Sequence, residues 1–136
     1  MGGSGDPPGT RQGSAETKGA KRVEKTETLE VLLRGLKGEI VISDENIDIV
    51  YMNDAAIKNH EKRGGADLIG KSLLDCHNAD SQRKIKEMYE AFADGDLKTR
   101  QIRVERGDIA RRSLMMPIMQ DGRVKGCVEL IVEEPL

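Results

Sequence analysis

Residues 38–56 read GEIVISDENIDIVYMNDAA, and this stretch decides the fold. Two runs rich in β-branched residues, EIVIS (39–43) and IDIVYM (47–52), flank a short polar connection. Such a pattern is typical of a β-hairpin. Asn53 or Asp54 then favours the start of a helix, because a short polar side chain can accept a hydrogen bond from the first free backbone amides. The stretch therefore predicts a hairpin that leads directly into a helix.

Short helical segments are predicted after this hairpin. NDAAIKNHEKRGG (53–65) continues the first helix and stops at its two glycines. ADLIGKSLLDCHN (66–78) indicates one or two brief helical turns, interrupted by Gly70.

The clearest helix signal is SQRKIKEMYEAFADG (81–95). We expect Ser81 or Asp80 to cap it and Gly95 to end it. Three apolar side chains recur at helical spacing and predict the buried face. They are Ile85, Met88 and Phe92.

The last third of the chain changes to the alternation of strands. TRQIRVERG (99–107) predicts one strand, and ARRSLMMPIMQ (110–120) and RVKGCVELIVEE (123–134) predict two more. The last two flank Asp-Gly at 121–122, which is the strongest short hairpin signal in the chain. Pro117 lies inside its strand, so we expect it at a sheet edge or a bulge.

This order of elements predicts an α+β domain, an antiparallel sheet with short helices gathered on one face. We expect this domain to span residues 38–134. An amphipathic helix is predicted over 26–37. Residues 1–25 are rich in Gly, Pro, Ser and Thr and poor in apolar residues, so they are expected to be a disordered tail or a linker left from cloning.

The helix over 26–37 carries an apolar stripe that indicates an interaction surface. It either packs on its own domain or pairs with a second copy of the chain. The stripe consists of Leu29, Leu32, Leu33 and Leu36.

Composition limits the classes of function. The net charge is -2 and aromatic residues make up 2% of the 136 residues, which argues against nucleic-acid binding. No apolar run approaches the length of a membrane span. The two cysteines, with no export signal, are expected to be free thiols in a cytoplasmic protein.

Several local phrases, in this order, resemble the PAS domain family of sensory modules. They are the opening stretch 38–56, with its Asn53-x-Ala55 step, DLIGKSLLD (67–75) and the closing PIMQDGRVKGCVELIVEE (117–134). The resemblance covers about residues 30–134. It implies a five-stranded antiparallel sheet in the order 2-1-5-4-3, a cavity able to hold a ligand, and signalling through a flanking helix.

The resemblance implies a sensory module without catalytic activity. We expect it to bind a small ligand or cofactor in its cavity and to relay the bound state through the flanking helix of a homodimer. The alternative is a ligand-free dimerisation module. No output signature is found, so the output domain is expected elsewhere in a longer protein or in a partner. The identity of a cofactor is not predicted.

The pair Cys76-His77 is the candidate site, because it precedes the clearest helix. One class of haem-binding PAS domain takes its histidine from the short helical segment at this place, so the resemblance implies His77 as a haem ligand. Met115 and Met116 would then line the site or supply a second ligand. Flavin photochemistry is not expected, because the Asn-Cys-Arg phrase of flavin-binding members is missing.

Three other interpretations of the pair remain open. His77 can be a hydrogen-bonded turn residue, with Cys76 as a small buried hydrophobe. The two residues can form a nucleophilic site, although adjacent residues seldom achieve that geometry. Cys76 can also be a redox thiol, since the start of the following helix would lower its pKa.

Overall fold

The computed structural model describes residues 25–136, and these fall into two units that we describe separately, up to Leu33 and from Arg34 onward. A helix covers residues 25–34, and all but its last residue belong to the first unit. The predicted tail lies outside the described residues except for its last position. The helix ends before Gly35, not at residue 37, because glycine favours leaving a helix. Leu36 of the predicted stripe therefore lies beyond the helix.

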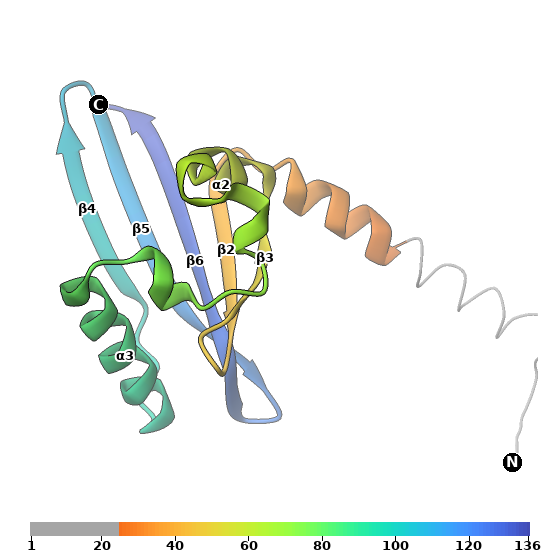
Figure 1. Cartoon of the computed structure of the whole chain (residues 1–136), viewed down its shortest axis with the longest axis vertical. Helices are drawn as coiled ribbons and strands as arrows, with labels where there is room; N and C mark the ends of the chain where they lie inside the picture. The colour runs from red at the N-terminus through yellow and green to blue at the C-terminus, as the bar shows by residue number, and fades with distance from the viewer. Residues whose placement is uncertain (1–24) are drawn as a thin grey trace, which may run out of the picture. The chain divides into compact units, whose positions relative to one another are not determined.

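The second unit contains the remaining strands and helices (Figure 1). Their order is β2 (Glu39–Asp44), β3 (Ile49–Met52), α2 (Asp54–Asn59), η2 (Glu61–Arg63), η3 (Gly65–Leu68), η4 (Leu73–Cys76), α3 (Ala79–Ala93), β4 (Arg100–Arg106), β5 (Ile109–Gln120) and β6 (Arg123–Pro135), where η marks a 3-10 helix.

The strands form one five-stranded antiparallel sheet in the order β3-β2-β6-β5-β4. Numbered along the chain, this is the order 2-1-5-4-3 that the resemblance implied. β2 and β6 are neighbours, so the first hairpin and the last meet at the centre of the sheet. The helices of this unit lie over one face of the sheet (Figure 1). The predicted α+β class is confirmed.

The hairpin between β5 and β6 has the predicted turn. Asp121 and Gly122 have φ of 52° and 76°, and two positive φ values match the right-handed twist of the flanking strands. Pro117 also lies where predicted. β4 pairs with β5 only as far as Met115, so Pro117 has a strand neighbour on one side, next to a bulge after Ile118.

The first hairpin is present, but its second strand is shorter than predicted. The Asp44 side chain accepts hydrogen bonds from the amides of Asn46 and Asp48, at 2.9 and 3.0 Å. These bonds hold a tight turn in which Ile47 has a φ of 65°. Residues 47 and 48 are therefore part of the turn, and β3 begins at Ile49.

Asn53 caps α2 as predicted, but the predicted cap of α3 is wrong. Asn78 is the residue before α3, and its side chain accepts a hydrogen bond from the Ser81 amide at 2.9 Å. α3 therefore starts at Ala79. At the other end, α2 gives way to 3-10 turns after Asn59, before the two glycines.

Two apolar clusters join the helices to the sheet. The first contains Met88, Phe92 and Cys127, between α3 and β6, and Phe92 is only 1% exposed. The second lies under α2 and η3 and consists of Val41, Ile49, Met52, Ala56 and Leu68. None of the helices found in residues 25–136 has the length and apolar character needed to cross a bilayer.

Candidate ligand-binding site

A cavity of about 170 Å³ lies between α3, the η4 segment and the helix-covered face of the sheet. Its wall is largely apolar, as is usual for sites that bind small organic molecules. The apolar lining comes from three strands and two helical segments. It consists of Val41, Leu73, Ile85, Met88, Ile102 and Met115.

The cavity continues into a groove of about 470 Å³ between α3 and the start of β4. Lys84, Ile85, Met88, Ile102 and Met115 line both spaces. Ile102 is 53% exposed although it belongs to the lining, so it marks the mouth of the cavity.

Glu129 is the one carboxylate among the residues that line this cavity. It has no hydrogen bond or ion pair with any residue of the described part of the chain. Burial raises the pKa of its carboxyl group, and the neighbouring His77 opposes that shift. An unpaired acidic group in an apolar wall is costly, so it marks a candidate contact for a ligand.

The alternation of residues along β6 is a signal in the sequence for the position of Glu129. Cys127, Glu129 and Ile131 alternate along one face of a strand, and the two neighbours are only 3% and 5% exposed. A carboxylate between two apolar residues of one strand face is placed against the core.

Both side chains of the Cys76-His77 pair are held by one backbone carbonyl, that of Leu73. His77 Nδ1 lies 2.8 Å from this oxygen and Cys76 Sγ lies 3.2 Å from it. Because a carbonyl only accepts, Nδ1 carries the proton of this bond. Nδ1 is also the nitrogen next to Sγ, at 3.5 Å, so in this arrangement it does not serve as the base for the thiol.

The proposed redox role of Cys76 is opposed by its surroundings. Burial raises the pKa of Cys76, against the lowering that we expected from the start of α3. Burial also raises the pKa of Cys127 to about 12. Both cysteines are free, as predicted, and both are thiols of low reactivity.

The structure places the residues predicted for a haem site on two faces of the sheet. His77 and Met115 line the cavity. Met116 follows Met115 on β5, and successive side chains of a strand point to opposite faces, so Met116 lies on the other side of the sheet.

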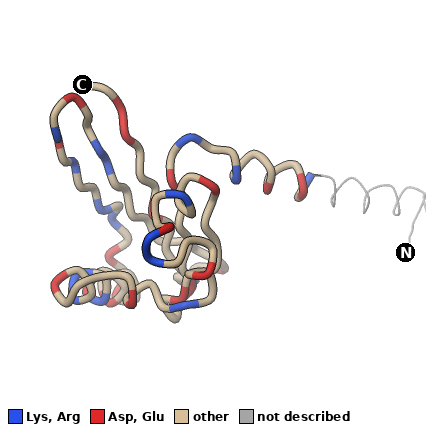
Figure 2. Tube along the Cα trace, turned by 45° about the horizontal axis from the view of Figure 1, so that its top comes forward, with Lys and Arg blue, Asp and Glu red and all other residues tan. Residues whose placement is uncertain are grey.

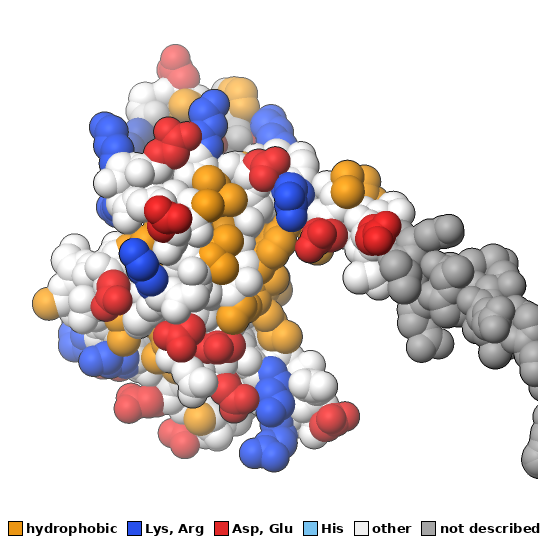
Figure 3. Space-filling model, turned by 45° about the vertical axis from the view of Figure 1, so that its right-hand side comes forward, with side chains coloured by type: hydrophobic (Ala, Val, Ile, Leu, Met, Phe, Trp, Pro, Cys, Tyr) orange, Lys and Arg blue, Asp and Glu red, His pale blue; other side chains and the backbone are white. Residues whose placement is uncertain are grey.

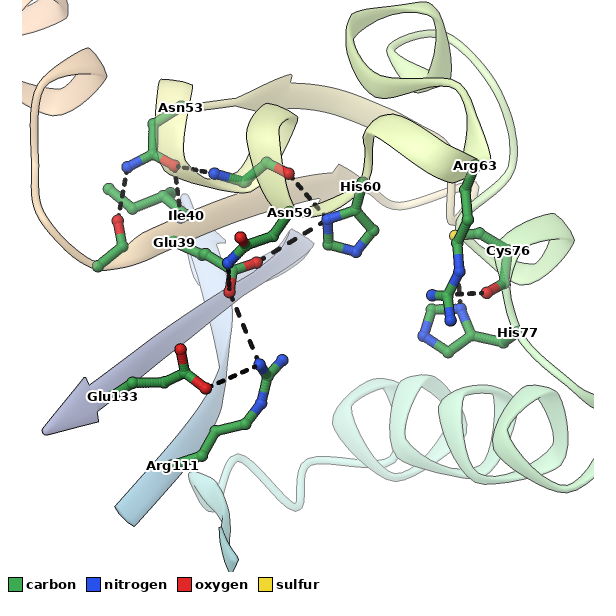
Figure 4. Close-up of polar contacts among 12 residues, drawn as sticks. Glu39, Ile40, Asn53, Asn59, His60, Arg63, Cys76, His77, Arg111 and Glu133 are labelled. Carbon is green, nitrogen blue, oxygen red and sulfur yellow. Dashed lines mark hydrogen bonds and ion pairs between the residues drawn. The ribbon is translucent and has the colours of Figure 1, made fainter. Parts of the chain in front are cut away.

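Asn53 ties the segment 36–38 to β2 and to the start of α2 (Figure 4). Its side-chain oxygen accepts from the amides of Ile40 and Ala56, at 2.9 and 3.1 Å. Its amide nitrogen donates to the carbonyls of Gly38 and Leu36, at 2.8 and 3.4 Å. The side chain is fully buried. One residue therefore ties the start of α2 to the segment that enters the sheet.

A second buried carboxylate, Glu39, lies beside this junction (Figure 4). Glu39 is 4% exposed and accepts a hydrogen bond from Asn59 at 2.7 Å. His60 Nδ1 lies 3.8 Å from its other oxygen, which has no hydrogen-bond partner within residues 25–136. Arg111 lies 3.9 Å from Glu39 and 3.6 Å from Glu133. The cluster links β2, the end of α2 and the neighbouring strands.

Basic positions recur along β4 and β5 (Figure 2), and in these two strands they are all arginines. Arg100 pairs with Asp96 at 3.7 Å, and Arg103 pairs with Glu105. Such exposed pairs contribute little to stability, but they give this surface a mixed charge.

A five-stranded antiparallel sheet in this order, with helices closing a cavity over one face, is the fold of a sensory domain class. A family model described as PAS domain matches residues 29–133. The chain therefore belongs to the PAS domain family, whose members typically serve in sensory signalling.

Solved structures show the same fold at low sequence identity. The PAS domain of an HTR-like protein from Haloarcula marismortui has a TM-score of 0.59 at 13% identity, covering 82% of this chain and 99% of that one. A sensory box sensor histidine kinase from Vibrio cholerae has a TM-score of 0.55 at 16% identity, covering 88% and 98%. The Aer2 receptor of Vibrio cholerae, described as a dual PAS-heme oxygen sensor, has a TM-score of 0.52 at 15% identity, covering 73% and 96%. No curated protein matches the sequence.

Proposed function

We propose that this domain is a sensory module that binds a small molecule in its cavity and relays the bound state through the N-terminal helix of a homodimer. The observation that carries the proposal is the cavity itself, an apolar space of about 170 Å³ that contains the unpaired carboxylate of Glu129. A space of this composition, within a domain of a sensory family, supports ligand binding over catalysis. The output module belongs to another part of a longer protein or to a partner.

The relay is supported by the position of β2. Val41 and Ser43 on this strand line the cavity, and the backbone amide of Ile40, the residue before Val41, donates a hydrogen bond to the Asn53 side chain. A ligand that shifts β2 therefore acts on the residues that hold the segment 36–38. A ligand that binds more tightly to one position of β2 increases the population of molecules in that position, and the N-terminal helix passes the change on.

Ile102→Trp is expected to block the cavity, because the larger side chain fills its mouth. We expect a subset of single-ring compounds to raise the melting temperature of the wild type, and this shift to fall at least about fivefold in Ile102→Trp. Val104→Trp is the matched control, since Val104 lies on the same face of β4, is 38% exposed and does not line the cavity. Thermal-shift measurements and native mass spectrometry test this. Equal shifts in Ile102→Trp and the wild type would contradict binding in the cavity.

The N-terminal helix carries the surface proposed for dimerisation (Figure 3). Leu29 and Leu32 are 52% and 63% exposed, and Leu33 and Leu36 are also exposed. Changing both Leu29 and Leu32 to Asp is expected to convert a dimer to a monomer without loss of the domain fold, because buried charge at a helix contact is costly. Sedimentation equilibrium and circular dichroism measure the two effects.

Val31→Asp is the control for this surface. Val31 is 68% exposed but lies on the opposite side of the helix from the leucine stripe. We expect this variant to remain a dimer. A monomeric wild type would contradict the dimer relay, and dissociation by Val31→Asp would contradict the assigned face.

Two alternative proposals follow from other observations. The exposed leucines also suit a ligand-free dimerisation module, which the failure of every compound to bind would favour.

Haem bound through His77 remains a proposal, supported by the position of His77 in the cavity lining. The cavity of about 170 Å³ is too small for a porphyrin as it stands, so haem would also need the adjoining groove. An absorption spectrum after expression with added haem tests this.

A further inference from the structure

We infer that the cavity takes an organic cation with a single ring, whose ammonium or amidinium group pairs with Glu129. This inference rests on the proposed function, because it names the chemical class of ligand for the same cavity.

The size of the cavity sets the size of the ligand. An engineered protein cavity of about 150 Å³, lined by apolar side chains, accepts one molecule of benzene. The present cavity is slightly larger, at about 170 Å³, and its wall is likewise built mainly from aliphatic and Met side chains. It therefore has room for one six-membered ring with a short substituent.

The charge of the ligand follows from the state of Glu129. Its carboxyl group lies between two buried residues of β6 and has no hydrogen bond or ion pair with the described residues. Burial penalises the ionised form, so the group gains from either a proton or a cationic partner. A ligand cation supplies that partner together with charge-assisted hydrogen bonds.

None of the other charged groups within the described residues forms a hydrogen bond or ion pair with Glu129. Lys84 lines the cavity, but its ammonium lies 3.2 Å from the Asp80 carboxylate at the exposed surface. His77 uses Nδ1 for the Leu73 carbonyl. Arg111 lies close to Glu39 and Glu133.

The more distant charges act on Glu129 in opposite directions. Glu39 raises the pKa of Glu129, and His60 and Arg111 lower it. With no group paired to the carboxylate of Glu129, the cavity favours a cation over an anion.

Three probes with the same ring and different charge test the inference: benzylamine, benzyl alcohol and benzoate. We expect the full chain to bind benzylamine most tightly and benzoate least, measured by ligand-observed NMR titration. Glu129→Gln keeps the shape of the side chain and removes its charge. It should weaken the binding of benzylamine roughly 10- to 100-fold, the range for a hydrogen bond to a charged group. The affinity for benzyl alcohol should stay nearly unchanged.

Glu134→Gln is the matched control, because Glu134 lies on the same strand but is exposed and outside the cavity. This variant should bind all three probes as the wild type does. Ile102→Trp should weaken every probe that binds, which locates the binding in the cavity.

The outcomes separate this inference from the proposed function. If the probes bind and Ile102→Trp blocks them, but the alcohol binds as tightly as the amine or Glu129→Gln changes nothing, only the inference about charge is overturned. If none of the three binds, the inference is overturned as well. The proposed function then depends on whether compounds of another class bind in a way that Ile102→Trp blocks.

Discussion

Asn53→Ala is expected to lower the free energy of unfolding by about 3 to 5 kcal/mol. The substitution removes the side chain that bonds the amides of Ile40 and Ala56 and the carbonyls of Leu36 and Gly38. Most of this loss comes from backbone groups that stay buried without a partner, because each then makes no hydrogen bond to protein or to water. Urea unfolding followed by far-UV circular dichroism measures the change.

Two further variants identify the cause of the effect. Asn46→Ala removes an exposed asparagine whose side chain makes no hydrogen bond with residues 25–136, and we expect less than about 0.5 kcal/mol from it. Asn53→Asp keeps the acceptor oxygen but loses the donated bonds and buries a charge, so its loss should also be large. If Asn53→Ala costs no more than Asn46→Ala, Asn53 does not hold the junction.

In the proposed relay, the position of Asn53 links stability to signalling. Its oxygen bonds lie inside the domain, at the start of α2 and on β2, and its amide bonds hold the segment that leads from the N-terminal helix. Asn53 can transmit a displacement of β2 to the segment 36–38 only while the bonds of its oxygen and of its amide nitrogen are both intact. In the proposed relay, Asn53 is therefore a positioning residue and not a ligand contact.

The fold could be predicted because the local signals agree with one another. The β-branched runs of 38–56, the apolar stripe of 81–95 and the Asp-Gly turn at 121–122 each specify one element, and together they specify an antiparallel sheet with helices on one face. The strand order came from the family resemblance. Spacing along the chain does not say that β2 and β6 are neighbours, because that pairing joins residues far apart in sequence.

The ends of elements were harder to predict because single side chains decide them. Asp44 draws two backbone amides into a turn and so removes two residues from β3. Asn78, Asp80 and Ser81 are all good caps by type, and the sequence does not show which one accepts the first free amide. Which residue caps the helix depends on the path of the preceding segment in the folded structure.

The candidate site was predicted only in part. His77 and Met115 lie in the cavity lining, and their role as ligand contacts stays a prediction. The pKa of Cys76 could not be predicted, because burial has the largest effect on it and burial is a property of the fold. Glu129 could not be predicted as a site residue from the sequence. Its alternation with Cys127 and Ile131 is informative only once their face of β6 is known to be buried.

Gly126→Ala is expected to lower the free energy of unfolding by at least about 3 kcal/mol, because it forces apart the two central strands. A Cβ atom at Gly126 would lie 2.2 Å from the Ser43 carbonyl oxygen and 3.2 Å from the Asp44 Cα atom. Both contacts are with backbone, so no side chain can turn away to relieve them. Gly126 pairs with Asp44 in the ladder between β2 and β6, where the two hairpins join. Thermal and urea unfolding measure the loss.

Gly107→Ala is the control for Gly126→Ala, since it adds the same methyl group with no atom within 4 Å. Gly107 has a φ of 57°, so its substitution carries only the backbone cost of about 1 to 2 kcal/mol. Gly126 has no such conformational demand, and its larger loss would come from the contact alone. Because Ser43 and Cys127 line the cavity next to this contact, Gly126→Ala should also weaken the binding of any cavity ligand, whereas Gly107→Ala should not. Equal losses of stability in the two variants would contradict a close strand contact at Gly126.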